Sequence, residues 1–188
     1  ASDAVNVTVN TAGVATVTAD KTSACKNTGV LLDVTMAGGS APYTYLWRTS
    51  ATTKTAPVTI TATTAYVVTV TDANGCESTG SITITMNDLP AVSAGANQAI
   101  CLGESATLTA SGAKDYVWDI PSNLQQVTVS PLVTTIYTVT GTDANGCTAT
   151  SNVTVTVKSL PNADAGEDKT ICKGSPVKLI ASGGSSYS

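Results

Sequence analysis

Tyr137-Thr-Val-Thr-Gly-Thr-Asp-Ala-Asn-Gly-Cys147 is a run of alternating Val and Thr that leads into a turn, and a second Thr/Val-rich run follows it. Asp and Asn favour turns because their side chains hydrogen-bond to the local backbone, and Gly accepts positive φ. The segment therefore predicts a β-hairpin. A near copy, Tyr66-Val-Val-Thr-Val-Thr-Asp-Ala-Asn-Gly-Cys76, lies upstream. A hairpin that recurs whole indicates a repeated domain.

Equivalent residues recur at a constant interval of 71 positions. This interval separates Trp47 from Trp118, Tyr66 from Tyr137, Asp72 from Asp143, Cys76 from Cys147, and Cys101 from Cys172. The chain is therefore predicted to be a tandem array. We expect residues 1–12 to be the last strand of an upstream repeat, 13–88 and 89–160 to be whole repeats, and 161–188 to be the start of a further, truncated repeat.

The composition favours an all-β protein. Of the 188 residues, 42% are hydrophobic and 12% are charged, so there is enough apolar surface for small cores. No apolar segment keeps a 3.6-residue period, and none approaches the roughly 20 residues that span a bilayer. A net charge of −4 without Lys/Arg clusters argues against nucleic-acid partners. We therefore expect neither nucleic-acid binding nor membrane insertion.

Short strands at regular spacing, separated by turn signals, predict tandem immunoglobulin-like β-sandwiches with repeats of about 71 to 76 residues. Trp47 and Trp118 on strand C, and Tyr66 and Tyr137 at the start of strand F, are the predicted core aromatics. The first repeat is predicted to have strands A, B, C, E, F and G at Val14–Thr18, Val30–Ala37, Tyr43–Arg48, Val58–Ala62, Ala65–Thr71 and Ser78–Met86. The second is predicted to have strands B, C, E, F and G at Ser105–Ser111, Tyr116–Ile120, Val127–Ser130, Thr135–Thr142 and Ala149–Lys158.

The same residues carry a family resemblance. Ala94–Ser105 and Ala165–Pro176 share the pattern Ala-Gly-x-Asx-x-x-Ile-Cys-x-Gly-x-Ser/Pro, and a Trp and the hairpin motif follow. This pattern resembles the Ig-like repeats of large Bacteroidetes surface and gliding-motility adhesins exported by type IX secretion, and is distantly similar to PKD repeats. The first repeat departs from it at Val17-Thr-Ala-Asp20 and in a longer interval from Cys25 to Trp47.

The resemblance implies an extracellular filament or stalk at the cell surface that extends and presents an adhesive region. The expected partners are neighbouring repeats of the same chain, with other copies of the chain or a surface glycan as further candidates. The alternative is a non-catalytic carbohydrate-binding or spacer module of a secreted polysaccharide-degrading enzyme. Such a binding module needs an exposed aromatic platform, whereas the Trp and Tyr residues here are assigned to the core.

The five cysteines, Cys25, Cys76, Cys101, Cys147 and Cys172, are widely spaced, and the chain contains no His. Zinc sites need close pairs of thiolates or imidazoles, so disulfides in an oxidising compartment are the better interpretation. Pairing within repeats would join Cys25 to Cys76 and Cys101 to Cys147.

Topology favours a different pairing. Cys25 and Cys101 are predicted in the turn from A to B, at the opposite end of a sandwich from the F–G turn that contains Cys76. Strands of about seven residues separate these ends by more than about 20 Å, whereas a disulfide needs Cβ atoms about 4 Å apart. Cys25 is therefore expected to pair with Cys147 between repeats, and Cys76, Cys101 and Cys172 to pair with partners outside the segment.

No catalytic site is expected. Without His a Ser/His/Asp triad cannot be built, and Asp115 and Asp119 on either side of Trp118 are interpreted as solvated strand residues. No cofactor is predicted. Asp72 and Asp143 are weak calcium candidates, because turn capping explains both carboxylates without a metal ion.

Overall fold

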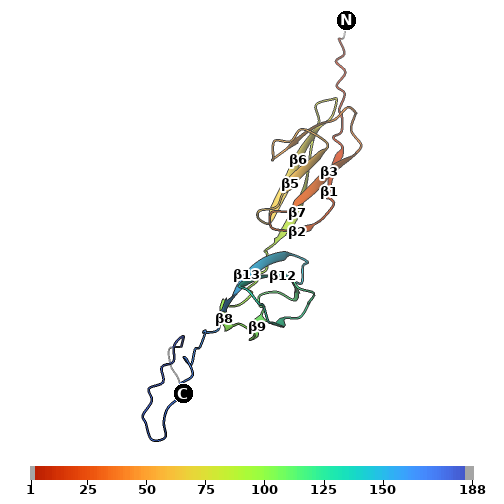
Figure 1. Cartoon of the computed structure of the whole chain (residues 1–188). Coiled ribbons are helices and arrows are strands. Elements are labelled where there is room, and N and C mark those ends of the chain that lie inside the picture. The colour runs from red at the N-terminus through yellow and green to blue at the C-terminus, as the bar shows by residue number, and fades with distance from the viewer. Residues whose placement is uncertain (1–2, 185–188) are drawn as a thin grey trace. The chain divides into compact units, whose positions relative to one another are not determined.

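The computed structural model describes residues 3–184 and is all-β, as the composition predicts (Figure 1). Its described residues include no helix able to cross a membrane. The chain divides into two compact units. The first comprises Ala1–Pro90 together with Thr142–Ala149, and the second comprises Ala91–Gly141 together with Thr150–Ser188.

The first unit contains a sandwich of two sheets. Its strands are β1 (Val14–Ala19), β2 (Ser23–Cys25), β3 (Gly29–Ala37), β4 (Thr44–Trp47), β5 (Thr55–Thr59), β6 (Thr64–Thr71) and β7 (Glu77–Asn87). One sheet has the order β1-β3-β5 and the other has the order β2-β7-β6-β4. β1 pairs antiparallel with β3, whereas β2 pairs parallel with β7. The first strand is thus divided between the two sheets, and the rest follow immunoglobulin-like connectivity.

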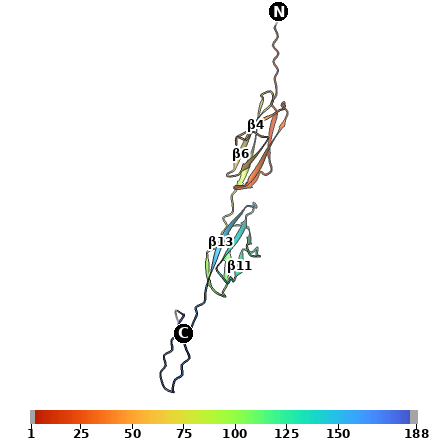
Figure 2. The ribbon, with the colours of Figure 1, turned by 45° about the horizontal axis from the view of Figure 1, so that its top comes forward.

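The second sandwich repeats this topology. Its strands are β8 (Gln98–Cys101), β9 (Ala106–Thr109), β10 (Asp115–Trp118), β11 (Gln126–Val129), β12 (Thr135–Thr142) and β13 (Thr148–Lys158). The sheets have the orders β10-β12-β13-β8 and β11-β9, and Figure 2 shows β13 and β11 on these two sheets. The Ser93–Ser111 bridge stands where β1 and β3 pair in the first unit. The predicted tandem immunoglobulin-like fold is therefore confirmed.

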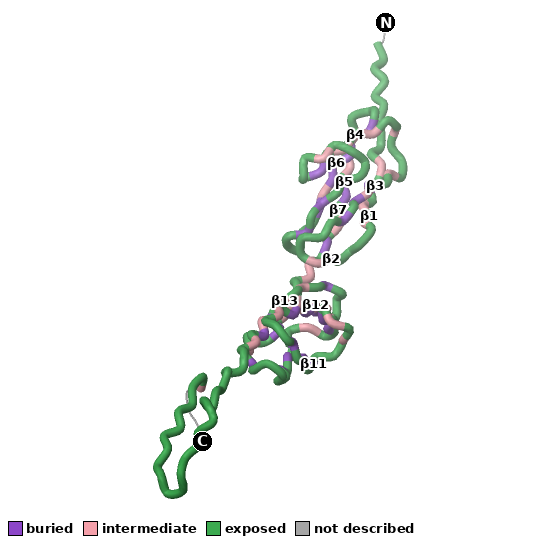
Figure 3. Tube along the Cα trace, viewed as in Figure 1, coloured by how far each residue is buried: buried purple, intermediate pink, exposed green. Residues whose placement is uncertain are grey.

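Each core is built from alternating side chains of the two facing sheets. Leu32 and Val34 on β3, and Leu108 on β9, are fully buried, and small residues such as Ala106 fill the space between them. The four predicted core aromatics are also buried: Trp47, Tyr66, Trp118 and Tyr137. Figure 3 shows the buried segments on the strands of the two sandwiches, whereas both chain ends are exposed.

The fifth strand of the first unit differs from the prediction. The expected strand was Val58–Ala62, with Thr49–Pro57 as a connection, but β5 spans Thr55–Thr59. It cannot extend further because its partner β3 begins at Gly29, opposite Thr59. Pro57 is tolerated inside β5 because β5 is an edge strand, where a missing N–H breaks no ladder hydrogen bond. In the second unit the corresponding strand begins and ends one residue earlier than predicted.

The prediction also missed the short strands β2 and β8. Cys25 and Cys101 were placed in the turn from A to B, but they are the last residues of these strands. Both strands pair parallel with the last strand of their sandwich, so that Cys25 lies opposite Asn87 and Cys101 opposite Lys158. Segments of three or four residues are too short to show an alternating pattern, and their pairing is long-range.

The segments at the two chain ends carry strand patterns without strand partners. Residues 3–12 are exposed and form no strand. Between residues 161 and 184 the structure contains an isolated bridge, Asp164–Ser182, and Val177 and Leu179 are exposed. The predictions for residues 1, 2 and 185–188 lie outside the described residues.

Candidate functional site: the hairpin turns and the disulfide

The turn between β6 and β7 is organised around the buried carboxylate of Asp72. Its Oδ1 accepts hydrogen bonds from the backbone N–H groups of Asn74 and Cys76, both at 2.9 Å. Its Oδ2 accepts a third from the N–H of Ser40 at 3.1 Å, and Asn74 Nδ2 donates to Ser40 Oγ at 2.8 Å. Gly75 has φ of 79°, which favours glycine at this position. The local Asx turn is therefore tied to a loop more than 30 residues away in the sequence.

This arrangement lowers the pKa of Asp72 from its ordinary value of 3.8. The N–H of Cys76 contributes most, followed by that of Ser40, because both stabilise the charged carboxylate, and burial opposes them. A depressed pKa in the folded state stabilises the protein at pH values above the ordinary pKa. This stabilisation is lost as the pH falls through the folded-state pKa.

We expect Asp72→Asn to unfold at a lower urea concentration than the wild type at pH 7. The amide keeps one acceptor oxygen but loses the charge and the second oxygen. The difference between the two proteins should shrink as the pH falls below about 4, where the unfolded wild-type carboxyl becomes protonated. Asp115→Asn, at an exposed position on β10, is the matched control and should change little. A difference that stays constant from pH 7 to pH 3 would exclude the charged carboxylate as its cause.

The turn between β12 and β13 has the same local geometry. The Oδ1 atom of Asp143 accepts hydrogen bonds from the N–H groups of Asn145 and Cys147, both at 2.8 Å. Gly146 also has φ of 79°. The two weak calcium candidates, Asp72 and Asp143, thus use their carboxylates to cap backbone N–H groups. Among residues 3–184 no group of three His, Cys, Asp or Glu side chains is placed to hold a metal ion.

Cys25 and Cys147 form a disulfide with a Cα–Cα distance of 5.6 Å and a sequence separation of 122. It lies within the first unit, since that unit includes the β12–β13 turn. This is the pairing favoured by the topological argument. Both half-cystines sit on fixed backbone, because Asp143 holds the N–H of Cys147 and β7 pairs with β2 at Cys25. Cys147 is almost fully buried, and a hollow of about 360 Å³ beside Cys25 is lined partly by Asn145.

The three other cysteines are free thiols in this structure, which contradicts the intra-repeat pairs Cys25–Cys76 and Cys101–Cys147. Cys76 is half-buried, and its Sγ lies 3.9 Å from the carbonyl oxygen of Asn10. Cys101 and Cys172 are exposed.

Two of the free thiols occupy backbone settings that match those of the half-cystines. The N–H of Cys76 is held by Asp72 as that of Cys147 is held by Asp143. Cys101 ends β8 as Cys25 ends β2, and the N–H of the following residue bonds to β13 or β7, respectively. Each sandwich thus presents one cysteine of each kind.

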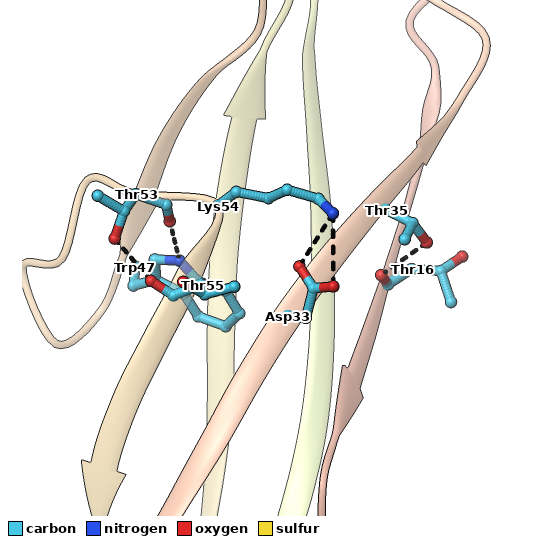
Figure 4. A network of polar contacts seen from close by, with 7 residues as sticks. All are labelled: Thr16, Asp33, Thr35, Trp47, Thr53, Lys54 and Thr55. Carbon is cyan, nitrogen blue, oxygen red and sulfur yellow. Dashed lines mark hydrogen bonds and ion pairs between the residues drawn. The ribbon is translucent and has the colours of Figure 1, made fainter.

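Charged residues elsewhere in the first unit serve structural roles (Figure 4). Lys54 Nζ lies 3.3 and 3.4 Å from the two carboxylate oxygens of Asp33, in a largely exposed pair. Such pairs contribute about 0 to 1 kcal/mol. Trp47 Nε1 donates to the carbonyl oxygen of Thr53 at 2.9 Å, so the buried indole is satisfied. In the second unit, Asp119 accepts a hydrogen bond from the N–H of Thr138.

No family model and no curated protein matches this chain. Solved structures with a similar fold are all distant. Three N-terminal domains of the Highly Immunogenic Outer Capsid protein (Hoc) of bacteriophage RB49 share 19% identity, covering 91% of this chain and 69% of theirs, with a TM-score of 0.43. A Ca²⁺-stabilised, ice-binding adhesin of an Antarctic bacterium shares 18% identity, covering 84% and 53%, with a TM-score of 0.47.

The eight N-terminal Ig domains of the Down Syndrome Cell Adhesion Molecule share 14% identity with this chain. The match covers 84% of this chain and 25% of that one, with a TM-score of 0.49. Similarities this weak carry no argument about function, and the assignment to the immunoglobulin-like class rests on the strand order described above.

Proposed function

We propose that this chain is a structural repeat segment of an extracellular bacterial surface filament or adhesin stalk that extends and presents an adhesive region. The observation that carries the proposal is the Cys25–Cys147 disulfide, which connects residues 122 positions apart in a tandem Ig-like array. A cross-link over this span restricts how far the chain can extend under load. A disulfide also fits an oxidising, extracytoplasmic compartment.

The proposal extends to the repeats and the remaining cysteines. Residues 13–88 and 89–160 would be whole repeats, and the neighbouring repeats would be each other's partners. Because Cys101 matches Cys25 in backbone setting and Cys76 matches Cys147, the same cross-link can recur along a longer chain. Cys76, Cys101 and Cys172 would then pair with cysteines outside this segment. Bacteroidetes gliding-motility adhesins exported by type IX secretion are the group that the sequence pattern favours.

A non-catalytic role fits the side chains present. The sequence contains no His to act as a general base, and Asp72, Asp119 and Asp143 cap backbone N–H groups. The alternative role as a carbohydrate-binding module has less support. Trp47 and Trp118 are buried, and their indole N–H groups donate to backbone carbonyls, so neither presents a face for stacking on sugar rings.

Imaging and binding measurements together test the proposal. Antibodies raised against this chain should label filaments that project from the surface of the native cells, seen by electron microscopy. The purified chain should give no saturable signal on a glycan array and should not hydrolyse glycans or peptides. Saturable glycan binding together with labelling of a secreted enzyme would instead establish the carbohydrate-binding alternative.

A further inference from the structure

β11 has one free edge. In its two-stranded sheet it pairs with β9, and no other described strand pairs with it. Its register places Val127 opposite Leu108, and the N–H of Ala110 donates to the carbonyl oxygen of Gln125 at 2.9 Å. Backbone groups alternate in direction along a strand, so those of Val127 and Val129 face β9. The N–H and C=O groups of Gln126 and Thr128 therefore face the open side.

The equivalent edge of the first unit is blocked. There the hydrogen bonds Val34 N–H to Lys54 O and Ile60 N–H to Thr28 O show that even-numbered residues of β5 face β3. Pro57 therefore faces the open side, where it offers no N–H. Proline and lysine are the residue types that protect edge strands from pairing with other chains. At the positions 71 residues after Lys54 and Pro57, the second repeat has Gln125 and Thr128.

The surroundings of this edge are uncharged and partly apolar. No charged residue occurs from Ile120 to Thr142. Leu124 precedes β11 and is 64% exposed, and Leu132 and Val133 follow it at 75% and 70%. Exposed apolar groups beside an open strand edge are features of an interaction surface.

We propose that the free edge of β11 pairs with β11 of a second copy of this chain. The two strands would run antiparallel about a two-fold axis at Thr128, whose N–H and C=O would bond to those of Thr128 in the second copy. In this register Gln126 comes opposite Ser130 of the second copy, and Leu124 comes opposite its Leu132. The exposed leucines at the two ends of each strand then meet each other, as an isologous interface requires.

The absence of charge favours a second copy as the occupant. Self-pairing about a two-fold axis brings each central residue close to its own counterpart, so a charged edge would repel itself. This edge has no such charge, and it offers no fixed charge to a charged peptide or phosphate group. The interface goes beyond the proposed stalk function, because it would connect stalks laterally.

A four-residue strand buries little area, so each contact should be weak. In a long array, many such edges would act together, and their combined strength would exceed that of one contact. Self-association of the isolated chain should therefore appear at high protein concentration and reverse on dilution.

Sedimentation velocity over a range of protein concentrations tests this proposal. The measurement uses a variant in which Cys76, Cys101 and Cys172 are Ser, so that exposed thiols cannot link chains covalently. This protein should shift from monomer to dimer as its concentration rises. Thr128→Pro should remove the shift while keeping the fold, because Pro57 occupies the equivalent position in β5. Thr128→Val keeps the N–H and should still dimerise.

Two further measurements separate this edge from other surfaces. The amide proton of Thr128 should exchange more slowly at high protein concentration, whereas that of Tyr45 on the edge strand β4 should not change. Leu132→Glu should weaken dimerisation at low salt and weaken it less at high salt, because salt screens the repulsion between the introduced charges. A monomer at all concentrations, or dimerisation that persists in Thr128→Pro, would overturn the proposal.

Discussion

Replacing both Cys25 and Cys147 by Ser will lower the free energy of unfolding by about 3 to 5 kcal/mol. The disulfide closes a loop with a sequence separation of 122, and in the chain-entropy treatment a 100-residue loop contributes about 4.7 kcal/mol. Urea unfolding followed by circular dichroism measures the change. The matched control replaces the free thiols Cys76, Cys101 and Cys172 by Ser, and this variant should retain the wild-type midpoint.

The same variant will extend much further under force. While the disulfide is intact, the 122 residues that it encloses cannot be stretched, even after both sandwiches unfold. Their extended length is roughly 400 to 440 Å, at 3.3 to 3.6 Å per residue. Single-molecule pulling from the chain ends should therefore show this gain in contour length in the double Ser variant and in the wild type after reduction. Equal contour lengths for oxidised and reduced wild type would show that the disulfide does not carry load.

Trp47→Ala will destabilise the protein by about 3 to 5 kcal/mol. The indole is 1% exposed in a core with few large side chains, and its removal leaves a cavity. It also leaves the carbonyl oxygen of Thr53 without its indole donor. The loss is a large fraction of the 5 to 15 kcal/mol that stabilises a typical domain.

Unfolding of Trp47→Ala can be followed by the fluorescence of Trp118, the remaining tryptophan, together with circular dichroism. Circular dichroism should show an earlier transition, while the Trp118 transition, which reports the second sandwich, should move less. The control is Leu46→Ala on the same strand, where the side chain is 57% exposed, and this change should cost less than about 0.5 kcal/mol. An equally large loss in Leu46→Ala would show that strand β4, and not the buried indole, accounts for the effect.

Several features of the fold follow from local sequence signals. The alternation of Val and Thr around Asp-Ala-Asn-Gly predicts the β6–β7 and β12–β13 hairpins, because side-chain direction and turn chemistry depend on neighbouring residues. The 71-residue interval places Trp47 and Trp118 at equivalent core positions, and both are buried. Strand lengths and disulfide geometry also favour the Cys25–Cys147 pairing, which is the pairing in the structure.

The remaining features depend on residues far apart in the sequence. β2 and β8 are strands because they pair with β7 and β13, and their own three or four residues carry no detectable pattern. The register with β3 decides where β5 ends and directs Pro57 to an open edge. The third hydrogen bond to Asp72 comes from Ser40, and β11 has an open side only because no other described strand packs there. The sequence alone therefore determined the repeat, the hairpins and the buried faces, while tertiary pairing decided which strand ends and edges are satisfied, because backbone groups can bond to any chain segment that folding brings beside them.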